Sequence, residues 1–176
     1  MIQIKRTDST NADFVALVKE LDAFLAKVDG DDHDFYNQFN GIDSLKHVVV
    51  AYDNDVPVAC GAIKSFDAQR MEVKRMFTLP KVRGRGIASQ VMNELEIWAA
   101  ELGYEYCVLE TGINQQEAIW LYERLAYERI ANYGQYVGVE NSFCFEKKVW
   151  NTFLKFYNSR ITKLYISSNV EFFSLP

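Results

Sequence analysis

The stretch M-E-V-K-R-M-F-T-L-P-K-V-R-G-R-G-I-A-S at residues 71–89 decides how this chain folds. It begins as a strand, passes through a loop with two glycines and opens directly into an amphipathic helix pattern. Five of its residues are Lys or Arg, although the 176-residue chain has a formal net charge of -5. Glycine lets a ligand approach the main chain closely, and the free N–H groups at a helix start attract anions. The stretch therefore predicts a cradle for phosphate groups.

Two common nucleotide-binding motifs are absent from this loop. It lacks the Lys-Ser/Thr ending of the mononucleotide P-loop, and its glycine spacing differs from that of the dinucleotide-binding Gly-x-Gly-x-x-Gly motif. A solvated turn with incidental charge is the alternative, but the strand before the loop and the amphipathic helix after it favour the cradle.

The loop resembles the acetyl-CoA-binding motif of the GNAT N-acetyltransferase superfamily. That motif has Gln or Arg, two further residues, Gly, one residue, and Gly or Ala, and here it reads K-V-R-G-R-G at residues 81–86. A second segment, N-Q-Q-E-A-I-W-L-Y-E-R-L-A-Y at residues 114–127, resembles the family's helix with a Leu-Tyr-Glu sequence. The resemblance covers residues 1–149, with both motifs in the expected order.

The chain departs from the family pattern in three places. Lys81 replaces Gln or Arg, and Gln115 stands where Asn is usual. Ala126 replaces the Gly that ends the helix, which puts a Cβ at an expected left-handed position and costs about 1 kcal/mol.

The strand patterns predict an antiparallel meander in the N-terminal half, because only short turns separate them. A helix separates the strand at 106–111 from the strand at 71–79, so these two must run parallel through a right-handed crossover. The predicted class is α+β, with a mixed sheet flanked by helices and a GNAT-like acyl-CoA N-acyltransferase fold. The expected strands are 2–6, 47–52, 56–65, 71–79, 106–111, 128–132 and 142–149. The first helix is expected to begin at a capping box, T-N-A-D at residues 10–13, and to stop at Asp29-Gly30. Further helices are expected at 33–39, 88–102 and 116–125.

Residues 1–149 are expected to form the GNAT-like domain, and residues 150–176 a C-terminal extension. The extension is rich in aromatic and β-prone residues. It predicts either an added strand that covers a sheet edge or pairs with a partner, as in a homodimer, or a chain end without a functional role.

The composition excludes several classes of protein. Hydrophobic residues make up 49% of the chain and charged residues 24%, which indicates a packed globule. No apolar run approaches the ~20 residues that span a bilayer, and the N-terminus lacks a signal-peptide core, so we expect a cytoplasmic protein without a membrane partner. The acidic balance argues against nucleic acid as a partner. Cys60, Cys107 and Cys144 are expected to be reduced thiols in the core.

The resemblance implies acetyl-CoA as the acyl donor, with no metal. Its pyrophosphate is expected on the backbone of the loop and the helix start, at Arg83, Gly84, Arg85, Gly86, Ile87, Ala88 and Ser89. Its pantetheine arm is expected beside Met76, Phe77 and Thr78, which requires this strand to splay from the strand at 106–111. Asn114 or Gln115 is a candidate hydrogen-bond partner of the pantetheine amides, although Asn114 also fits a helix N-cap.

Tyr122 is the candidate general acid. A phenol has an ordinary pKa near ~10, and it can donate a proton to a departing thiolate. The alternative is a core tyrosine, because Tyr at helical spacing is commonly a packing residue. The Leu-Tyr-Glu match favours the acid. Trp120, on the same helix, is expected to pack.

Glu72 is the candidate general base that accepts the proton of the amine. Strict alternation places Glu72 on one face of its strand with Lys74, Met76 and Thr78, and places Arg75 on the other face with Val73, Phe77 and Leu79. The alternative role of Glu72 is an ion pair with a Lys or Arg of a neighbouring strand.

The acceptor is expected to be a primary amine. Four Asp in D-G-D-D-H-D at residues 29–34 predict either a solvated connection or a carboxylate cluster that attracts a cationic amine. Glu110 and Thr111 are expected to line the acceptor pocket, with aromatic walls from Tyr36, Phe39 and residues 133–136.

We therefore expect an N-acetyltransferase that acts by direct attack in a ternary complex, because no cysteine has an activating environment. The alternatives are a non-catalytic acyl-CoA-binding module and a small nucleic-acid-binding domain.

Overall fold

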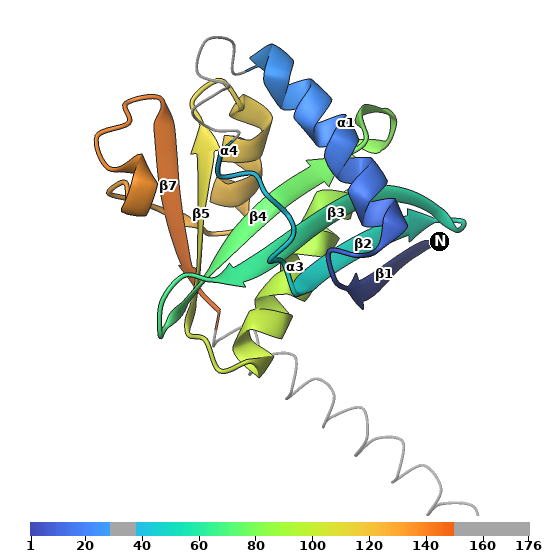
Figure 1. Ribbon diagram of the computed structural model, residues 1–176, viewed down its shortest axis with the longest axis horizontal. Helices are drawn as coiled ribbons and strands as arrows, with labels where there is room; N and C mark the ends of the chain where they lie inside the picture. The colour runs from blue at the N-terminus through green and yellow to red at the C-terminus, as the bar shows by residue number, and fades with distance from the viewer. Residues whose placement is uncertain (29–37, 150–176) are drawn as a thin grey trace, which may run out of the picture.

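A seven-stranded sheet forms the middle layer of the protein, and the computed structural model describes residues 1–28 and 38–149 of the chain (Figure 1). The strands are β1 (Ile2–Thr7), β2 (His47–Asp53), β3 (Val56–Ser65), β4 (Arg70–Thr78), β5 (Tyr106–Gly112), β6 (Glu128–Ile130) and β7 (Ser142–Lys148). Their order across the sheet is β1-β2-β3-β4-β5-β7-β6, and β4 and β5 are the one parallel pair in it. The predicted α+β class, with an antiparallel meander and one parallel crossover, is confirmed.

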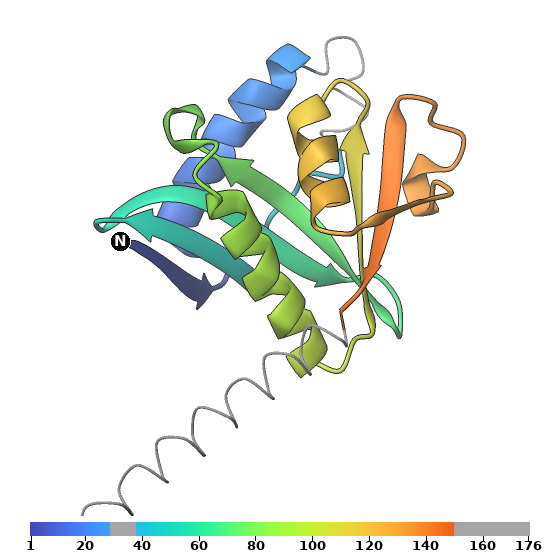
Figure 2. The same ribbon diagram turned by 180° about the vertical axis from the view of Figure 1, so that it is seen from behind.

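Helices cover both faces of this sheet. The α1 helix (Ala12–Val28) lies on one face, and α3 (Ile87–Glu101) and α4 (Gln116–Arg124) lie on the other, as the two opposite views show (Figures 1 and 2). Two short 3-10 turns, η2 (Pro80–Val82) and η3 (Gly134–Tyr136), lie in loops. No helix in the described part of the chain is long and apolar enough to cross a membrane.

The two-sided cover explains why the central strands read as unbroken apolar runs. Val48 and Val50 of β2 point to the α1 side, where they pack with Phe14. Val49 and Ala51 point to the opposite side, which α3 covers. Each face therefore has its own core, and both faces of β2 are apolar. Within these cores, all three cysteines are buried free thiols, as predicted.

A β-bulge interrupts the pairing of β3 with β4. Ala62 pairs with Lys74 and Cys60 with Phe77, so Gly61 alone faces both Arg75 and Met76. Arg75 has φ 57, which is uncommon for a residue with a side chain. A Cβ on Gly61 would lie 2.3 Å from the Met76 sulfur, so only glycine fits opposite the bulge.

The bulge corrects the predicted faces of β4. Alternation holds up to Lys74 and then shifts by one residue, so Phe77 packs with the α1-side core and Met76 with the α3-side core. Arg75 forms an ion pair with Asp22 of α1 and so lies on the same side as Glu72 and Lys74. The prediction that Glu72, Lys74, Met76 and Thr78 share one face was wrong.

Two smaller predictions also require correction. Asn11, not Thr10, caps α1, because its side-chain oxygen accepts the N–H of Phe14 at 2.9 Å. Trp120 does not pack in the core, since it is 64% exposed. The predicted helix at 33–39, the carboxylate run at 29–34 and the extension at 150–176 lie largely or wholly outside the described residues.

Ala126 has φ 64, the left-handed conformation that the sequence predicts. Ala126→Gly should therefore stabilise the protein by about 1 kcal/mol, because glycine adopts this conformation without a Cβ clash. Urea unfolding of the variant measures the change. The matched control is Ala23→Gly at an exposed position within α1, where the same change should destabilise by about 1 kcal/mol. Equal destabilisation in both variants would contradict the left-handed conformation of Ala126.

Candidate functional site

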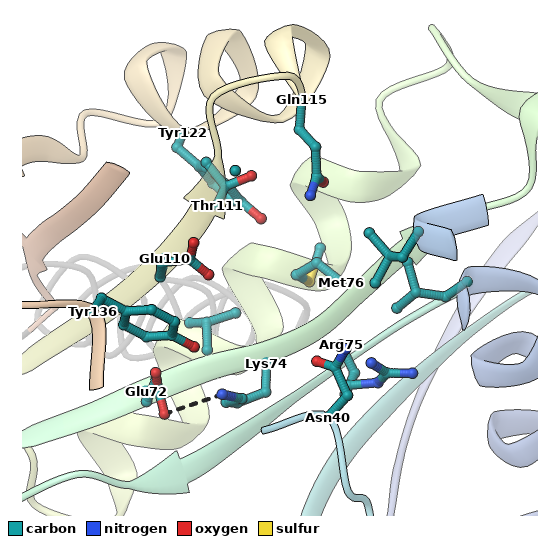
Figure 3. Close-up of a pocket in the computed structure, with 14 residues that line it drawn as sticks. Asn40, Glu72, Lys74, Arg75, Met76, Glu110, Thr111, Gln115, Tyr122 and Tyr136 are labelled. Carbon is teal, nitrogen blue, oxygen red and sulfur yellow. Dashed lines mark ion pairs between the residues drawn. The ribbon is translucent and has the colours of Figure 1, made fainter. Parts of the chain in front are cut away.

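A pocket of about 100 Å³ opens where β4 and β5 separate, and we call it the central pocket (Figure 3). It is lined by Leu21, Leu25, Asn40, Glu72, Val73, Lys74, Arg75, Met76, Glu110, Thr111, Gly112, Gln115, Tyr122 and Tyr136. The parallel ladder consists of three pairs and ends at Glu72 and Val108, although both strands continue further. The predicted splay between these strands is therefore present, and side chains from α1, β4, β5 and α4 meet in it.

The glycine loop lies between β4 and α3 and has the geometry of an anion cradle. Gly84 and Gly86 have φ 77 and 74, and Gly86 is the N-cap of α3. Within residues 1–28 and 38–149, the backbone N–H groups of residues 84–89 have no hydrogen-bond acceptor. These unpaired groups at the positive end of a 15-residue helix fit a phosphate.

Arg83 connects this loop to the neighbouring elements. Its Nε donates to the Thr78 carbonyl at 3.1 Å, and its Nη1 lies 2.9 Å from a carboxylate oxygen of Glu117 on α4. The Thr78 carbonyl, expected beside the pantetheine arm, is thus already bonded to Arg83. The Arg85 guanidinium pairs with Asp53 at 2.8 Å, away from α4.

The three predicted pantetheine residues differ in what they present. The Met76 side chain lines the central pocket. The Phe77 side chain is buried against α1, so only its backbone is available to a ligand. This end of β4 continues beyond its last pair with β5, which leaves one edge of the strand outside the parallel ladder.

Tyr122 is buried against Tyr127 and Phe145, with ring centroids 6.0 and 6.1 Å away, yet it also lines the central pocket. Its hydroxyl has no hydrogen-bond partner among the described residues. Burial, and secondarily the charge of Glu110, raises the pKa of Tyr122. The phenol therefore keeps its proton at neutral pH, as a proton donor must. The packing role and the pocket-lining position coexist.

Glu72 is 8% exposed and also lines the pocket. Its Oε2 lies 3.5 Å from the Lys74 Nζ, and its Oε1 accepts a long hydrogen bond of 3.3 Å from the Tyr133 hydroxyl. The alternative role, an ion pair, is therefore present, but the partner is on the same strand and not on a neighbouring one. Burial, with the Glu72 charge second, raises the pKa of Tyr133, which keeps this hydroxyl a donor.

The two candidates in the loop before α4 are placed differently. Gln115 points into the central pocket in Figure 3. Asn114 is exposed, and the alternative role as a helix cap is wrong, because Gln115 is the N-cap residue of α4. Glu110 and Thr111, expected near the acceptor, line the central pocket, and Glu110 accepts a hydrogen bond from the Ser142 hydroxyl at 2.7 Å.

A second pocket adjoins the first and shares Glu72 and Lys74 with it; we call it the outer pocket. It is lined by Gln38, Phe39, Gly41, Asp43, Ser44, Leu45, Lys64, Ser65, Phe66, Glu72, Lys74 and Gln135. Phe39 was predicted as an aromatic wall and lies here, whereas Tyr136 lies in the central pocket. Tyr36 falls outside the described residues.

Sequence reasoning missed Lys74, Arg75 and Asn40 as pocket residues. A signal for Lys74 was present, because it follows Glu72 by two residues on one strand face. A signal for Arg75 was also present, since alternation put a guanidinium on an apolar face between Val73 and Phe77. Such a conflict indicates a bulge. No motif marked Asn40, which comes to the pocket through tertiary structure.

The three thiols are unsuited to nucleophilic chemistry. Burial raises the pKa of the Cys60 thiol to about 12 and that of the Cys144 thiol to about 11, and it raises the pKa of Cys107 as well. A thiol needs a lowered pKa to supply thiolate at neutral pH.

Comparison with known proteins places this geometry in a family. Residues 14–127 match the model of the Acetyltransferase (GNAT) family. The uncharacterized N-acetyltransferase YjgM of Escherichia coli is 36% identical over 85 residues, which are 47% of this chain and 50% of that protein. The chain thus spans half the length of this relative.

Solved structures share the fold over most of the chain. A structure from Klebsiella pneumoniae described as an acyl-CoA N-acyltransferase has a TM-score of 0.71 and 28% identity, over 85% of this chain and 98% of that one. A GNAT family acetyltransferase from Elizabethkingia anophelis, with acetyl-CoA bound, has a TM-score of 0.58 and 16% identity, over 84% and 97% of the chains.

Glu117→Gln should tighten coenzyme A binding by up to about fivefold, because the Arg83–Glu117 pair holds Arg83 away from an incoming phosphate. The size is limited because the Glu117 side chain is 74% exposed, and exposed pairs are worth about 0–1 kcal/mol. Calorimetry with coenzyme A measures the dissociation constant. Glu123→Gln, at an exposed position on the same helix, is the matched control. Weaker binding in Glu117→Gln alone would show that Glu117 positions Arg83 for the ligand.

Proposed function

Because this chain belongs to the GNAT acetyltransferase family, we propose that it transfers the acetyl group of acetyl-CoA to a primary amine by direct attack in a ternary complex. The observation that carries the proposal is the central pocket between β4 and β5, which has both catalytic candidates in its lining, together with the anion cradle that follows β4 in the chain. The Elizabethkingia anophelis structure, which has acetyl-CoA bound, supports the choice of donor.

The donor fits the residues that surround the splay. The unpaired N–H groups of residues 84–89 are suited to the pyrophosphate, which carries negative charge and needs donors. The open edge of β4 is suited to the amide groups of the pantetheine arm, by the pairing that adds a strand to a sheet edge. Gln115 adds a side-chain amide from the opposite wall. This arrangement directs the sulfur toward Tyr122.

The chemistry requires two proton transfers. The amine nitrogen forms a bond with the acetyl carbon, and the carbon–sulfur bond breaks. Glu72 accepts the proton that the nitrogen loses, and Tyr122 gives its phenolic proton to the leaving sulfur. Both side chains line one pocket, and the raised pKa of Tyr122 keeps the required proton in place. The buried thiols, with their raised pKa values, support direct attack over an acetyl-cysteine intermediate.

Tyr122→Phe should lower kcat for acetyl transfer by roughly 10²-fold, within the usual range for a positioned acid. A screen of primary amines with acetyl-CoA, scored by release of free thiol, provides the substrate and the rates. The coenzyme A dissociation constant should be unchanged, since the change removes only an oxygen. Tyr52→Phe, which removes a hydroxyl bonded to Asp13 outside both pockets, is the control.

Unchanged turnover in Tyr122→Phe would remove the acid role. Tight coenzyme A binding without thiol release from any amine would contradict the transfer reaction and favour a non-catalytic acyl-CoA-binding module.

Glu72→Gln should alter the limb of the pH–rate profile that rises with pH, because that limb reports the group that must lose its proton. We expect kcat/KM to fall by roughly 10²-fold near neutral pH and the rising limb to shift or disappear. Glu128→Gln, at an exposed position on β6, should leave the profile unchanged. An identical rising limb in Glu72→Gln would leave Glu72 only its ion pair with Lys74.

A further inference from the structure

Arg75 has hydrogen-bonding capacity that the described protein does not use. The residue is 6% exposed, and its Nε and Nη1 are buried without any hydrogen-bond partner within residues 1–28 and 38–149. Only Nη2 is paired, with Asp22 of α1. A buried donor without an acceptor is costly, so most native structures avoid it.

The position of this guanidinium ties it to the reaction site. Arg75 occupies the bulge with its left-handed backbone, and its residue lines the central pocket together with Glu72 and Tyr122. Backbone strain and unsatisfied donors concentrate at binding sites, where a ligand supplies the missing contact. The Asp22 side chain is 44% exposed, so it offsets the buried charge only from the solvent side.

Arg75 lies apart from the carboxylates of the central pocket, whereas Lys74 lies beside Glu72. In Figure 3, Arg75 and Asn40 lie together on one side, and Glu110, Tyr136 and Glu72 lie on the opposite side. The first side offers a cation and an amide, which suit an anionic group. The second side offers the carboxylate of Glu110 and that of Glu72, which also pairs with Lys74, and carboxylates suit an amine. A molecule with both groups therefore matches the chemistry of the two sides of the pocket.

We infer that the acceptor amine carries a carboxylate, as an α-amino acid does, and that Arg75 is the residue that binds this carboxylate. The inference rests on the proposed function, since it names the substrate class of the same site. Guanidinium groups bind carboxylates and phosphates equally readily. The small volume of the pocket, the Asp22 carboxylate beside Arg75 and the Glu72 and Glu110 carboxylates across the pocket favour the smaller, singly charged carboxylate.

Matched substrate pairs test the inference. Alanine, methionine and phenylalanine are each compared with their α-amides, which keep the amine and side chain but lose the carboxylate charge. Thiol release with acetyl-CoA should give a kcat/KM at least tenfold higher for the acids than for their amides. The difference should arise from a lower KM for the acids. Acids that are no better than their amides would overturn the inference.

Substitutions then assign the preference to Arg75. Arg75→Met should abolish the preference for acids, because KM for the acids should rise at least tenfold more than KM for the amides. Asp22→Asn should lower KM for the acids severalfold, because it releases Nη2 for the substrate. Lys19→Met, which removes an exposed cation from α1, should leave both substrate classes unchanged. A preference that survives in Arg75→Met would overturn the assignment.

Two further measurements keep the outcome clear. Calorimetry with coenzyme A confirms that Arg75→Met is folded; if it is not, Asp22→Asn decides, and an unchanged KM for the acids overturns the inference. Titration of the acids into the coenzyme A complex separates the two proposals. Acids that bind without thiol release would support the inference and contradict the proposed function. Thiol release from the amides alone would support the proposed function and contradict the inference that Arg75 binds a substrate carboxylate.

Discussion

The structure depends on one interruption of its hydrogen-bond ladder. β4 pairs with β5 only as far as Glu72 and then bends at the bulge of Arg75 and Met76, so two neighbouring parallel strands diverge. The divergence creates a pocket in the middle of a sheet that is otherwise covered on both faces. It also leaves an open strand edge directly before the glycine loop, so the donor and the catalytic candidates can meet at one place. Gly61 makes room for the bulge, because a Cβ there would lie 2.3 Å from the Met76 sulfur and clash with it.

Most of the fold follows from local patterns in the sequence. The order of strands and helices was predictable because turn residues separate clear periodic segments, and the splay followed from the family resemblance. The left-handed Ala126 was predictable because the motif has glycine there. The bulge was missed because strict alternation assumes one residue per step on both strands. This error displaced Arg75 from the site, whereas Glu72 and Tyr122 came from positions that alternation and helical spacing treat correctly.

The contacts of the side chains were less predictable than the positions of the residues on strands and helices. Glu72 was expected to pair across strands, yet its partner Lys74 is on its own strand, because both side chains turn into the same pocket. Asn40 and Tyr136 approach from loops that no periodicity describes. Trp120 shows the converse error: an aromatic residue in a helical pattern is exposed because α4 is short and covers the sheet with one side only. These outcomes depend on tertiary contacts between segments far apart in the chain.

The two pockets share part of their lining, and this divides the lining residues into those that affect both pockets and those that affect the outer pocket alone. Glu72 and Lys74 belong to both pockets, so a substitution there alters both pockets together. Phe39, Phe66 and Gln135 line the outer pocket alone. Natural or laboratory evolution can therefore reshape the outer pocket while the lining of the central pocket keeps its geometry. Substitutions confined to the outer pocket therefore leave the bulge unchanged.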